Sequence, residues 1–263
     1  MKISDRTFII SGGASGLGRA TAVDLIQHGG YVAVLDMNEE LADELIAEVG
    51  KDKARFWRCD VAEPGSVKAA VEGALAWAKE TGKEVGGVVA AAGVGLPAKI
   101  LNRDLTPFSL DDFNFVVQIN LQGTIDLVRQ CLPALASNTP DGPDKEHGIV
   151  IMVASSAAFD GQPGQTAYAA SKGAITAMTL PMTRDLARYG IRVVTIAPSM
   201  FKSRMTDALS DKVKESLFRT MEFPRRPGMP EEFAHTVRMC VENVMLNGTV
   251  IRLDGGVRMP SKM

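Results

Sequence analysis

The sequence predicts an α/β protein with a parallel sheet of seven strands flanked by helices. Short apolar runs rich in β-branched residues alternate with longer amphipathic stretches along all 263 residues. The runs at 85–90 and 149–153 contain no charged or polar side chain, which is typical of strands covered on both faces. Alternation of strands and helices over the whole length indicates right-handed crossovers and a doubly wound sheet.

Each element follows from these patterns in order. We expect strands at 7–11, 31–36, 55–60, 85–92, 148–154, 191–197 and 249–253. We expect helices at 16–27, 39–49, 65–79, 110–136 and 168–187, and a less regular helical region at 210–241. The remaining segments 93–108 and 137–147 are long loops, of which the second is polar and is interpreted as an exposed insertion.

The organisation along the chain favours a single domain over 1–263. The sequence has no internal repeat and no linker rich in Pro and Ser. We expect a lid at about 198–226, which carries several Met, Leu and Phe residues. The first predicted strand begins at Thr7, so no cleavable presequence is expected.

Composition excludes several classes of protein. Apolar residues make up 46% and charged residues 23%, which are ordinary globular proportions that exclude extended disorder, collagen and coiled coil. The formal net charge of −2 disfavours nucleic-acid binding, and no apolar run is long enough to predict a membrane span. Cys59, Cys131 and Cys240 are scattered, so we expect buried thiols in a reducing compartment such as the cytoplasm or mitochondrial matrix. The histidines are isolated, so no metal site is expected.

A glycine-rich turn follows the first predicted strand and runs directly into a helix. Its sequence is Ser-Gly-Gly-Ala-Ser-Gly-Leu-Gly, with Gly12 at the start of the turn and Gly16 and Gly18 further along. Glycines let the backbone turn tightly and let a pyrophosphate approach, and the helix N-terminus offers free N–H groups. The pattern predicts a dinucleotide site and therefore a Rossmann fold.

Asp36 strengthens this prediction and favours one cofactor. It ends the second predicted strand, 18 residues after Gly18, close to the spacing expected for a carboxylate that binds the adenosine ribose. A carboxylate there would repel the 2′-phosphate of NADP, and neither Met37 nor Ser15 is basic. NAD is therefore expected rather than NADP. Asp60 is either a partner of the adenine amino group or a cap of the helix near Pro64.

A second group of residues indicates acid–base chemistry. Tyr168 and Lys172 are four residues apart, which places both on one face of the helix predicted at 168–187. Ser155 lies 13 residues before Tyr168, after the fifth predicted strand, where ligands of parallel sheets bind. The spacing favours Ser155 over Ser156 as the hydroxyl that meets Tyr168.

With these residues the sequence resembles the short-chain dehydrogenase/reductase family over nearly its whole length. Within that family it is similar to the type 10 17β-hydroxysteroid dehydrogenases, also called type II 3-hydroxyacyl-CoA dehydrogenases. The stretches that carry this second similarity are 157–165, 179–187 and 247–256, together with the long loops 93–108 and 137–147.

The resemblance implies an oxidoreductase in which Tyr168 exchanges a proton with the substrate. An ordinary tyrosine pKa near 10 is too high for a base at neutral pH, so the Lys172 ammonium and the cationic nicotinamide are expected to favour the phenolate. Ser155 would donate a hydrogen bond to the substrate oxygen. Lys172 would also hold the nicotinamide ribose, and Asn120 would bend the long helix and anchor a water to Lys172.

The resemblance also implies the remaining site residues and a homotetramer with 110–136 and 168–187 at one interface. The expected cofactor-binding residues are Ser11, Gly12, Ser15, Gly16, Leu17, Gly18, Asp36, Asp60, Val61, Ala92, Gly93, Tyr168, Lys172, Pro198, Phe201 and Ser203. The expected substrate-binding residues are Ser155, Gln162, Gln165 and Tyr168.

The sequence departs from the family pattern at three places. The family often has Asn-Asn-Ala-Gly after the fourth strand, where this chain has Ala90-Ala91-Ala92-Gly93, and we expect a cost in stability rather than in chemistry. Pro198-Ser199 replaces the common Pro-Gly, which leaves the cofactor geometry there open. Ser203 stands where a Thr often contacts the carboxamide.

The sequence leaves alternatives open for the substrate and for the class of function. An apolar, Met-rich lid suits an acyl chain, so a small-molecule substrate of the 3-hydroxyacyl-CoA class is expected. A steroid or a specialised metabolite is the alternative within the family. A nucleotide-sensing protein without chemistry is disfavoured by the intact Ser155, Tyr168 and Lys172, and a methyltransferase is disfavoured by the Tyr–Lys pair.

Overall fold

The protein has the predicted α/β fold, and the carboxyl ends of its parallel strands lie along one edge of the sheet. The computed structural model describes residues 1–202 and 221–259. Seven parallel strands lie in the order β3-β2-β1-β4-β5-β6-β7. Their bounds are β1 (Thr7–Ser11), β2 (Tyr31–Asp36), β3 (Ala54–Arg58), β4 (Val85–Ala90), β5 (Gly148–Val153), β6 (Ile191–Pro198) and β7 (Thr249–Leu253). The order reverses between β1 and β4, and such a switch point forms a ligand crevice in doubly wound sheets.

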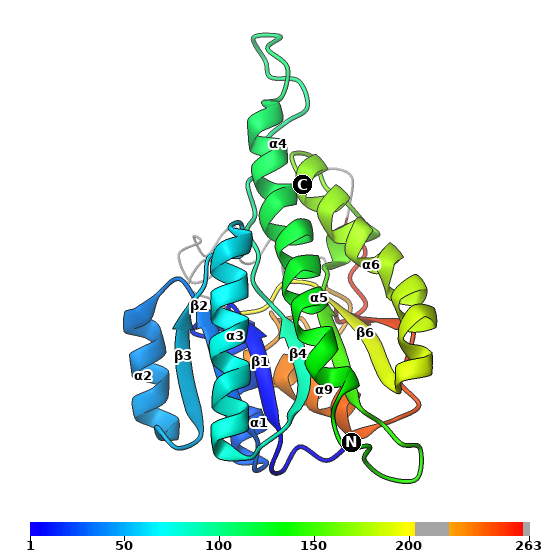
Figure 1. The fold of residues 1–263 in the computed structure, drawn as a ribbon. Coiled ribbons are helices and arrows are strands. Elements are labelled where there is room, and N and C mark those ends of the chain that lie inside the picture. Colours follow the sequence, from blue (N-terminus) through cyan, green and yellow to red (C-terminus); the bar gives the residue numbers. More distant parts are fainter. Residues whose placement is uncertain (203–220, 260–263) are drawn as a thin grey trace.

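Helices cover both faces of this sheet (Figure 1). The helices described are α1 (Gly16–Gln27), α2 (Glu39–Val49), α3 (Pro64–Thr81), α4 (Leu110–Val117), α5 (Gly123–Ala136), α6 (Thr166–Leu186) and α9 (Pro230–Glu242). One face packs against α3, α5 and α6, and the other against α1, α2 and α9. Among the described residues, no helix is both long and apolar enough to cross a membrane.

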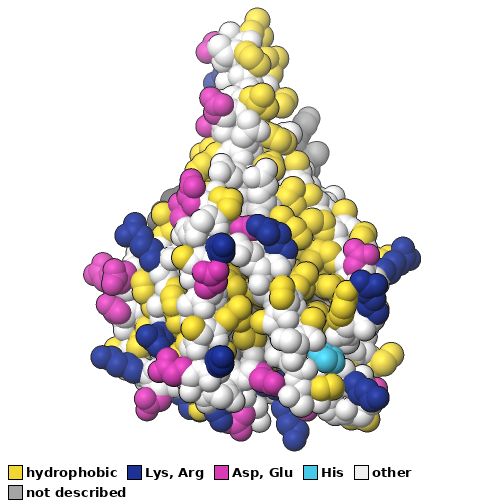
Figure 2. Space-filling model, in the orientation of Figure 1, with side chains coloured by type: hydrophobic (Ala, Val, Ile, Leu, Met, Phe, Trp, Pro, Cys, Tyr) yellow, Lys and Arg dark blue, Asp and Glu magenta, His cyan; other side chains and the backbone are white. Residues whose placement is uncertain are grey.

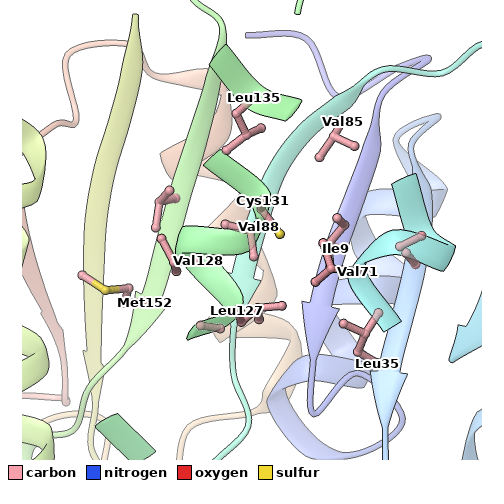
Figure 3. Close-up of a cluster of buried hydrophobic side chains, with 14 of the residues drawn as sticks. Ile9, Leu35, Val71, Val85, Val88, Leu127, Val128, Cys131, Leu135 and Met152 are labelled. Atoms are coloured by element: carbon pink, nitrogen blue, oxygen red, sulfur yellow. The ribbon is translucent and has the colours of Figure 1, made fainter. Parts of the chain in front are cut away.

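The core consists of two apolar clusters, one on each face of the sheet. Figure 3 shows the first, in which Ile9 and Val88 of the sheet meet Val71 of α3 and Leu127 of α5. The second cluster includes Phe8 and Phe233, both fully buried. All six residues of β4 and of β5 are buried, as expected for strands covered on both faces. The central strands are therefore a rigid base for the loops at their carboxyl ends.

The predicted elements are present, and their bounds differ where local geometry overrides the apolar pattern. The strand expected at 85–92 ends at Ala90, because the chain turns there toward the glycine-rich loop. The helix expected at 110–136 is interrupted by a π-helical turn at Gln118–Gln122. Of the region expected to be helical at 210–241, residues 210–220 lie outside the described residues, and α9 begins at Pro230.

The two long loops behave differently. Residues 91–109 project with α4 beyond the sheet (Figure 1), and Ile100 and Leu105 are exposed. The loop 137–147, interpreted as an exposed insertion, is exposed at Ser137, Thr139, Pro140 and residues 142–145, whereas Asn138 and Glu146 are buried. Its ends are anchored, because the buried Asn138 side chain donates to the carbonyl oxygens of Val85 and His147.

Glu146 at the end of this loop forms a buried ion pair. Its Oε1 accepts from Arg192 Nε of β6 at 2.7 Å, and both side chains are almost fully buried. The Arg192 guanidinium also donates to the carbonyl oxygens of Cys240 and Leu246. The pair therefore ties the loop, β6 and the end of α9 together.

We predict that Glu146→Gln lowers the free energy of unfolding by about 3 kcal/mol, because it leaves the Arg192 charge buried without a counter-ion. Urea denaturation of the two proteins measures this difference. The control is Glu80→Gln, whose partner Arg55 is exposed and whose loss should cost less than about 1 kcal/mol. Equal losses of unfolding free energy in Glu146→Gln and Glu80→Gln would contradict the conclusion that burial makes the Glu146–Arg192 pair important for stability.

Candidate active site

The glycine-rich turn lies between β1 and α1 and packs against the end of β4. Gly12 has a φ of +64°, and a Cβ there would lie 3.0 Å from the Ala92 backbone. A Cβ on Gly18 would overlap the Gly12 carbonyl oxygen. Ser11 Oγ accepts a hydrogen bond from the Ala92 N–H at 3.2 Å. These contacts hold the ends of β1 and β4 together, so the glycines are required by close packing.

A cavity of about 600 Å³ opens over this turn. It is lined by Gly12, Ala14, Ser15, Gly16, Leu17, Gly18, Arg19, Asp36, Met37, Leu41, Glu44, Cys59, Asp60, Val61, Ala91, Ala92, Gly93, Val94 and Ile119. No atom lies within 4 Å of the position that a Cβ on Gly16 would occupy, so the backbone there is open to a ligand. Because this opening stands at the N-terminus of α1, the residues fit a dinucleotide phosphate.

The Asp36 carboxylate is held at the rim of this cavity. Its Oδ2 accepts from the Ala14 N–H and its Oδ1 from the Asn38 N–H, both at 3.0 Å. The two bonds fix the carboxylate between β2 and the glycine-rich turn. Arg19 of α1, a cation in the lining of the same cavity, is paired with Glu48 of α2.

Of the other predicted cofactor residues on this side, Leu17, Asp60, Val61, Ala92 and Gly93 line the same cavity. Asp60 Oδ1 accepts from the Ala62 N–H at 2.9 Å, whereas the residue that caps α3 is Glu63. Leu41, Glu44 and Ile119 also line this cavity, but no sequence pattern predicted them, because apolar and acidic helix residues look the same in a cavity wall, a core or a surface.

Tyr168, Lys172 and Ser155 come together at the carboxyl end of β5. Tyr168 and Lys172 lie on one face of α6, with Lys172 Nζ 5.8 Å from the centre of the Tyr168 ring. A hydrogen bond joins the Tyr168 and Ser155 side chains, and Ser155 Oγ also accepts from the Ala157 N–H at 3.2 Å. Lys172 is buried and donates to the Val153 carbonyl oxygen at 2.9 Å.

Burial acts on the pKa values of Tyr168 and Lys172 in opposite directions. It raises the pKa of Tyr168, and the hydrogen bond from Ser155 offsets part of that effect. It lowers the pKa of Lys172 to about 8. The expectation that the Lys172 ammonium and the cationic nicotinamide together favour the phenolate stays a prediction, because within the chain alone desolvation disfavours each charged form. The chain's own residues place a neutral phenol beside Ser155.

Asn120 lies in the π-helical turn and connects the loop after β4 to α6. Its side chain accepts from the Val94 N–H and donates to the Val94 carbonyl oxygen, at 2.8 and 2.9 Å. It also donates to Ser171 Oγ at 3.1 Å. The π-helical turn widens the helix at the position where the sequence predicted a bend, and π-bulges of this kind occur frequently at functional sites.

Gly93 explains how Asn120 and Lys172 approach the same loop. A Cβ on Gly93 would lie 3.1 Å from Asn120 Oδ1 and 3.3 Å from Lys172 Nζ. Asn120 and Lys172 therefore face a shared space beside this glycine. The Val153 carbonyl and Ser171 complete the surroundings, and neither was identified from sequence.

Of the predicted substrate residues, Ser155, Gln162 and Gln165 lie on the segment between β5 and α6, and Tyr168 lies in the first turn of α6. Gln165 Oε1 accepts from the Gln162 N–H at 3.1 Å. Gln162 Nε2 is buried and has no hydrogen-bond partner within the described part of the chain. A buried amide without a partner is costly in a folded protein, and such a group is suited to a ligand oxygen.

Two of the remaining predicted residues, Pro198 and Phe201, lie at and just after the carboxyl end of β6. Pro198 is the last residue of that strand. Phe201 is buried against Phe233, with ring centres 6.2 Å apart, and Ser203 lies outside the described residues. Within 1–202 and 221–259, no three His, Cys, Asp or Glu side chains are grouped as metal ligands would be.

Comparison with known proteins gives the family. A family model described as short chain dehydrogenase matches residues 6–214. The chain is 41% identical to 3-hydroxyacyl-CoA dehydrogenase type-2 of Drosophila melanogaster over 98% of this chain and 99% of the relative. It is 42% identical to the protein of the same name from Bos taurus, over 95% and 94%. The crystal structure of 3-hydroxyacyl-CoA dehydrogenase type-2 from Mycobacterium avium superposes with a TM-score of 0.92 at 34% identity, covering 98% of this chain and 97% of the other. The chain therefore belongs to the short-chain dehydrogenases, a family of oxidoreductases that use nicotinamide cofactors.

Proposed function

We propose that this protein interconverts 3-hydroxyacyl-CoA and 3-oxoacyl-CoA with NAD as cofactor. The observation that carries the proposal is the arrangement of Ser155, Tyr168 and Lys172 at the carboxyl end of β5, beside the open cavity over the glycine-rich turn. The substrate class is taken from the relatives, which are named for 3-hydroxyacyl-CoA and align over nearly the whole chain.

In the proposed mechanism Tyr168 carries the substrate proton. During reduction the neutral phenol donates its proton to the forming alkoxide, and during oxidation the phenolate accepts the proton of the alcohol. Ser155 donates a hydrogen bond to the same substrate oxygen and stabilises the charge that develops on it. When bound, the nicotinamide supplies or accepts the hydride. Lys172 stands near enough to lower the cost of a phenolate by its charge.

The substrate side is proposed to include Gln162 and Gln165. The buried Gln162 Nε2 is available to donate to an acyl oxygen, and its own backbone N–H is bound by Gln165 Oε1. The thioester carbonyl of an acyl-CoA offers such an acceptor. A lid at about 198–226, only part of which is described, is proposed to cover the acyl chain.

We also propose a homotetramer of single-domain subunits in which α4, α5 and α6 lie at one interface. Phe115 of α4 is 48% exposed and Leu180 of α6 is 45% exposed. Figure 2 shows hydrophobic side chains gathered on the projection of the molecule and along the side where α6 lies. Large exposed apolar patches are typical of surfaces that another protein covers.

We predict that the purified protein oxidises 3-hydroxybutyryl-CoA with NAD and that Tyr168→Phe lowers kcat by about a thousandfold, since it removes the group that transfers the proton. Absorbance of NADH at steady state measures both rates, with steroid and simple secondary alcohols as comparison substrates. The control Tyr189→Phe changes an exposed tyrosine and should keep full activity. Faster turnover of a steroid or another alcohol would overturn the substrate assignment, while an active Tyr168→Phe would overturn the mechanism.

We predict that Asp36→Asn changes the ratio of kcat/KM for NAD to that for NADP by at least about tenfold toward NADP, because a fixed negative charge no longer faces the 2′-phosphate. The measurement is initial rates with each cofactor at a fixed substrate concentration. Glu39→Gln removes a charge from the first turn of the neighbouring helix and serves as the control. An unchanged ratio in Asp36→Asn would show that Asp36 does not determine the preference for NAD over NADP.

We predict that kcat/KM for oxidation rises with pH, whereas kcat/KM for reduction does not rise. The raised pKa of Tyr168 keeps the phenol protonated at neutral pH. The protonated form that reduction needs is therefore abundant, and the phenolate that oxidation needs is a small fraction. The rise approaches about tenfold per pH unit at most, and it becomes shallower above the Lys172 pKa of about 8, where the ammonium is lost. Rates in both directions between about pH 6.5 and pH 9.5 test this, and a flat oxidation profile would contradict it.

A further inference from the structure

Residues 156–165, here called the substrate loop, connect the end of β5 to α6. Its first turn is held by backbone hydrogen bonds, because the N–H groups of Phe159 and Asp160 both donate to the Ser156 carbonyl oxygen at 3.0 Å. Its far end meets the projecting loop through the Ala98 N–H, which donates to the Gly164 carbonyl oxygen at 2.9 Å. The Phe159 ring is 47% exposed, so apolar burial contributes little to holding this loop in place.

A side chain from the opposite edge of the site reaches this loop. Arg252 of β7 donates to the Asp160 carboxylate, although the two residues are 92 positions apart. Its Nε donates to Asp254 Oδ2 at 2.6 Å. The same guanidinium lies 4.8 Å from the centre of the Phe159 ring. One planar group therefore binds a carboxylate and stacks on an aromatic ring of the same turn, an arrangement suited to Arg rather than Lys.

The end of β7 that carries Arg252 is itself held in place. Arg252 pairs with Ala197 and Leu253 with Pro198 in the register of β6 and β7. The Ser199 N–H donates to the Leu253 carbonyl oxygen at 3.1 Å. The Asp254 carboxylate is further held by the Gly256 N–H at 3.1 Å. Arg252 thus joins the substrate loop to the ordered edge of the sheet.

We infer that Arg252 is a positioning residue that, through Asp160 and Phe159, holds the substrate loop in the conformation that binds substrate. The inference rests on the proposed function in one respect, namely that Ser155, Gln162 and Gln165 face the substrate. The turn held by Arg252 begins directly after Ser155 and leads into Gln162. Displacement of this turn would move the substrate contacts and would leave the cofactor cavity over the glycine-rich turn unchanged.

The first test needs no substrate. Hydrogen exchange of backbone amides is measured in the wild type, Arg252→Gln and Arg258→Gln. The Arg258 side chain also donates to Asp254, at 3.1 Å, but is 62% exposed, and its hydrogen bonds within the described residues go to Asp254 and Val257 rather than to Asp160, so it is a matched control. We expect Arg252→Gln to speed exchange in 157–165 by about tenfold or more, with no change in 11–18, and Arg258→Gln to resemble the wild type. Unchanged exchange in 157–165 would overturn the inference whatever the substrate proves to be.

The second test separates positioning from a general structural effect. With the best substrate of the wild type, Arg252→Gln and Asp160→Asn should each raise KM by about tenfold, with kcat within about threefold. The double variant should be no worse than either single variant, because both remove one interaction. Arg252→Lys should recover part of the loss, and the Kd of NADH should stay unchanged. An unchanged KM, additive losses, or a parallel rise in the NADH Kd would each overturn the inference.

Discussion

The burial of the Lys172 ammonium is the constraint on which the rest of the site depends. A buried ammonium must find acceptors that the surrounding chain provides, and here the Val153 carbonyl at the end of β5 accepts at 2.9 Å. Gly93 leaves room for this approach, because a Cβ at that position would lie 3.3 Å from Lys172 Nζ. The end of β5, the loop after β4 and the face of α6 are therefore arranged around one nitrogen atom.

The same constraint accounts for the break between α4 and α5. The π-helical turn at Gln118–Gln122 brings Asn120 beside the loop after β4, where its side chain satisfies both backbone groups of Val94. Thr124 Oγ1 donates to the Asn120 carbonyl oxygen at 2.8 Å, so the irregular turn leaves that group paired. A regular helix would rotate Asn120 away from Val94, and the wall beside Lys172 would lose its support. The irregularity is thus part of the site.

The sequence predicted the parts of the site that depend on local pattern. The glycine-rich turn, the acid at Asp36 and the four-residue spacing of Tyr168 and Lys172 are all visible in short windows, and the structure brings each to the carboxyl edge of the sheet. Contacts between distant segments were not predicted. The Val153 carbonyl is a backbone group with no sequence signature, and the bond from Arg252 to Asp160 joins two ordinary charged residues that are 92 positions apart. Asp36 could be identified because a strand pattern precedes it, whereas nothing local distinguishes Asp160.

This difference has a physical basis in how the two sides of the site are built. The side that faces the cavity over the glycine-rich turn consists of backbone N–H groups, glycines and one carboxylate fixed by the Ala14 and Asn38 amides. Few substitutions at these positions would keep that geometry. The proposed substrate side consists of side chains on a loop, among them Gln162 and Gln165, and the Phe159–Asp160 turn of this loop contacts Arg252. Many side chains fit a loop, so one fold accommodates different substrates by changing this loop while the cofactor side stays the same. We therefore expect residues 156–165 to determine much of the substrate preference, and similarity in the glycine-rich turn to carry little information about it.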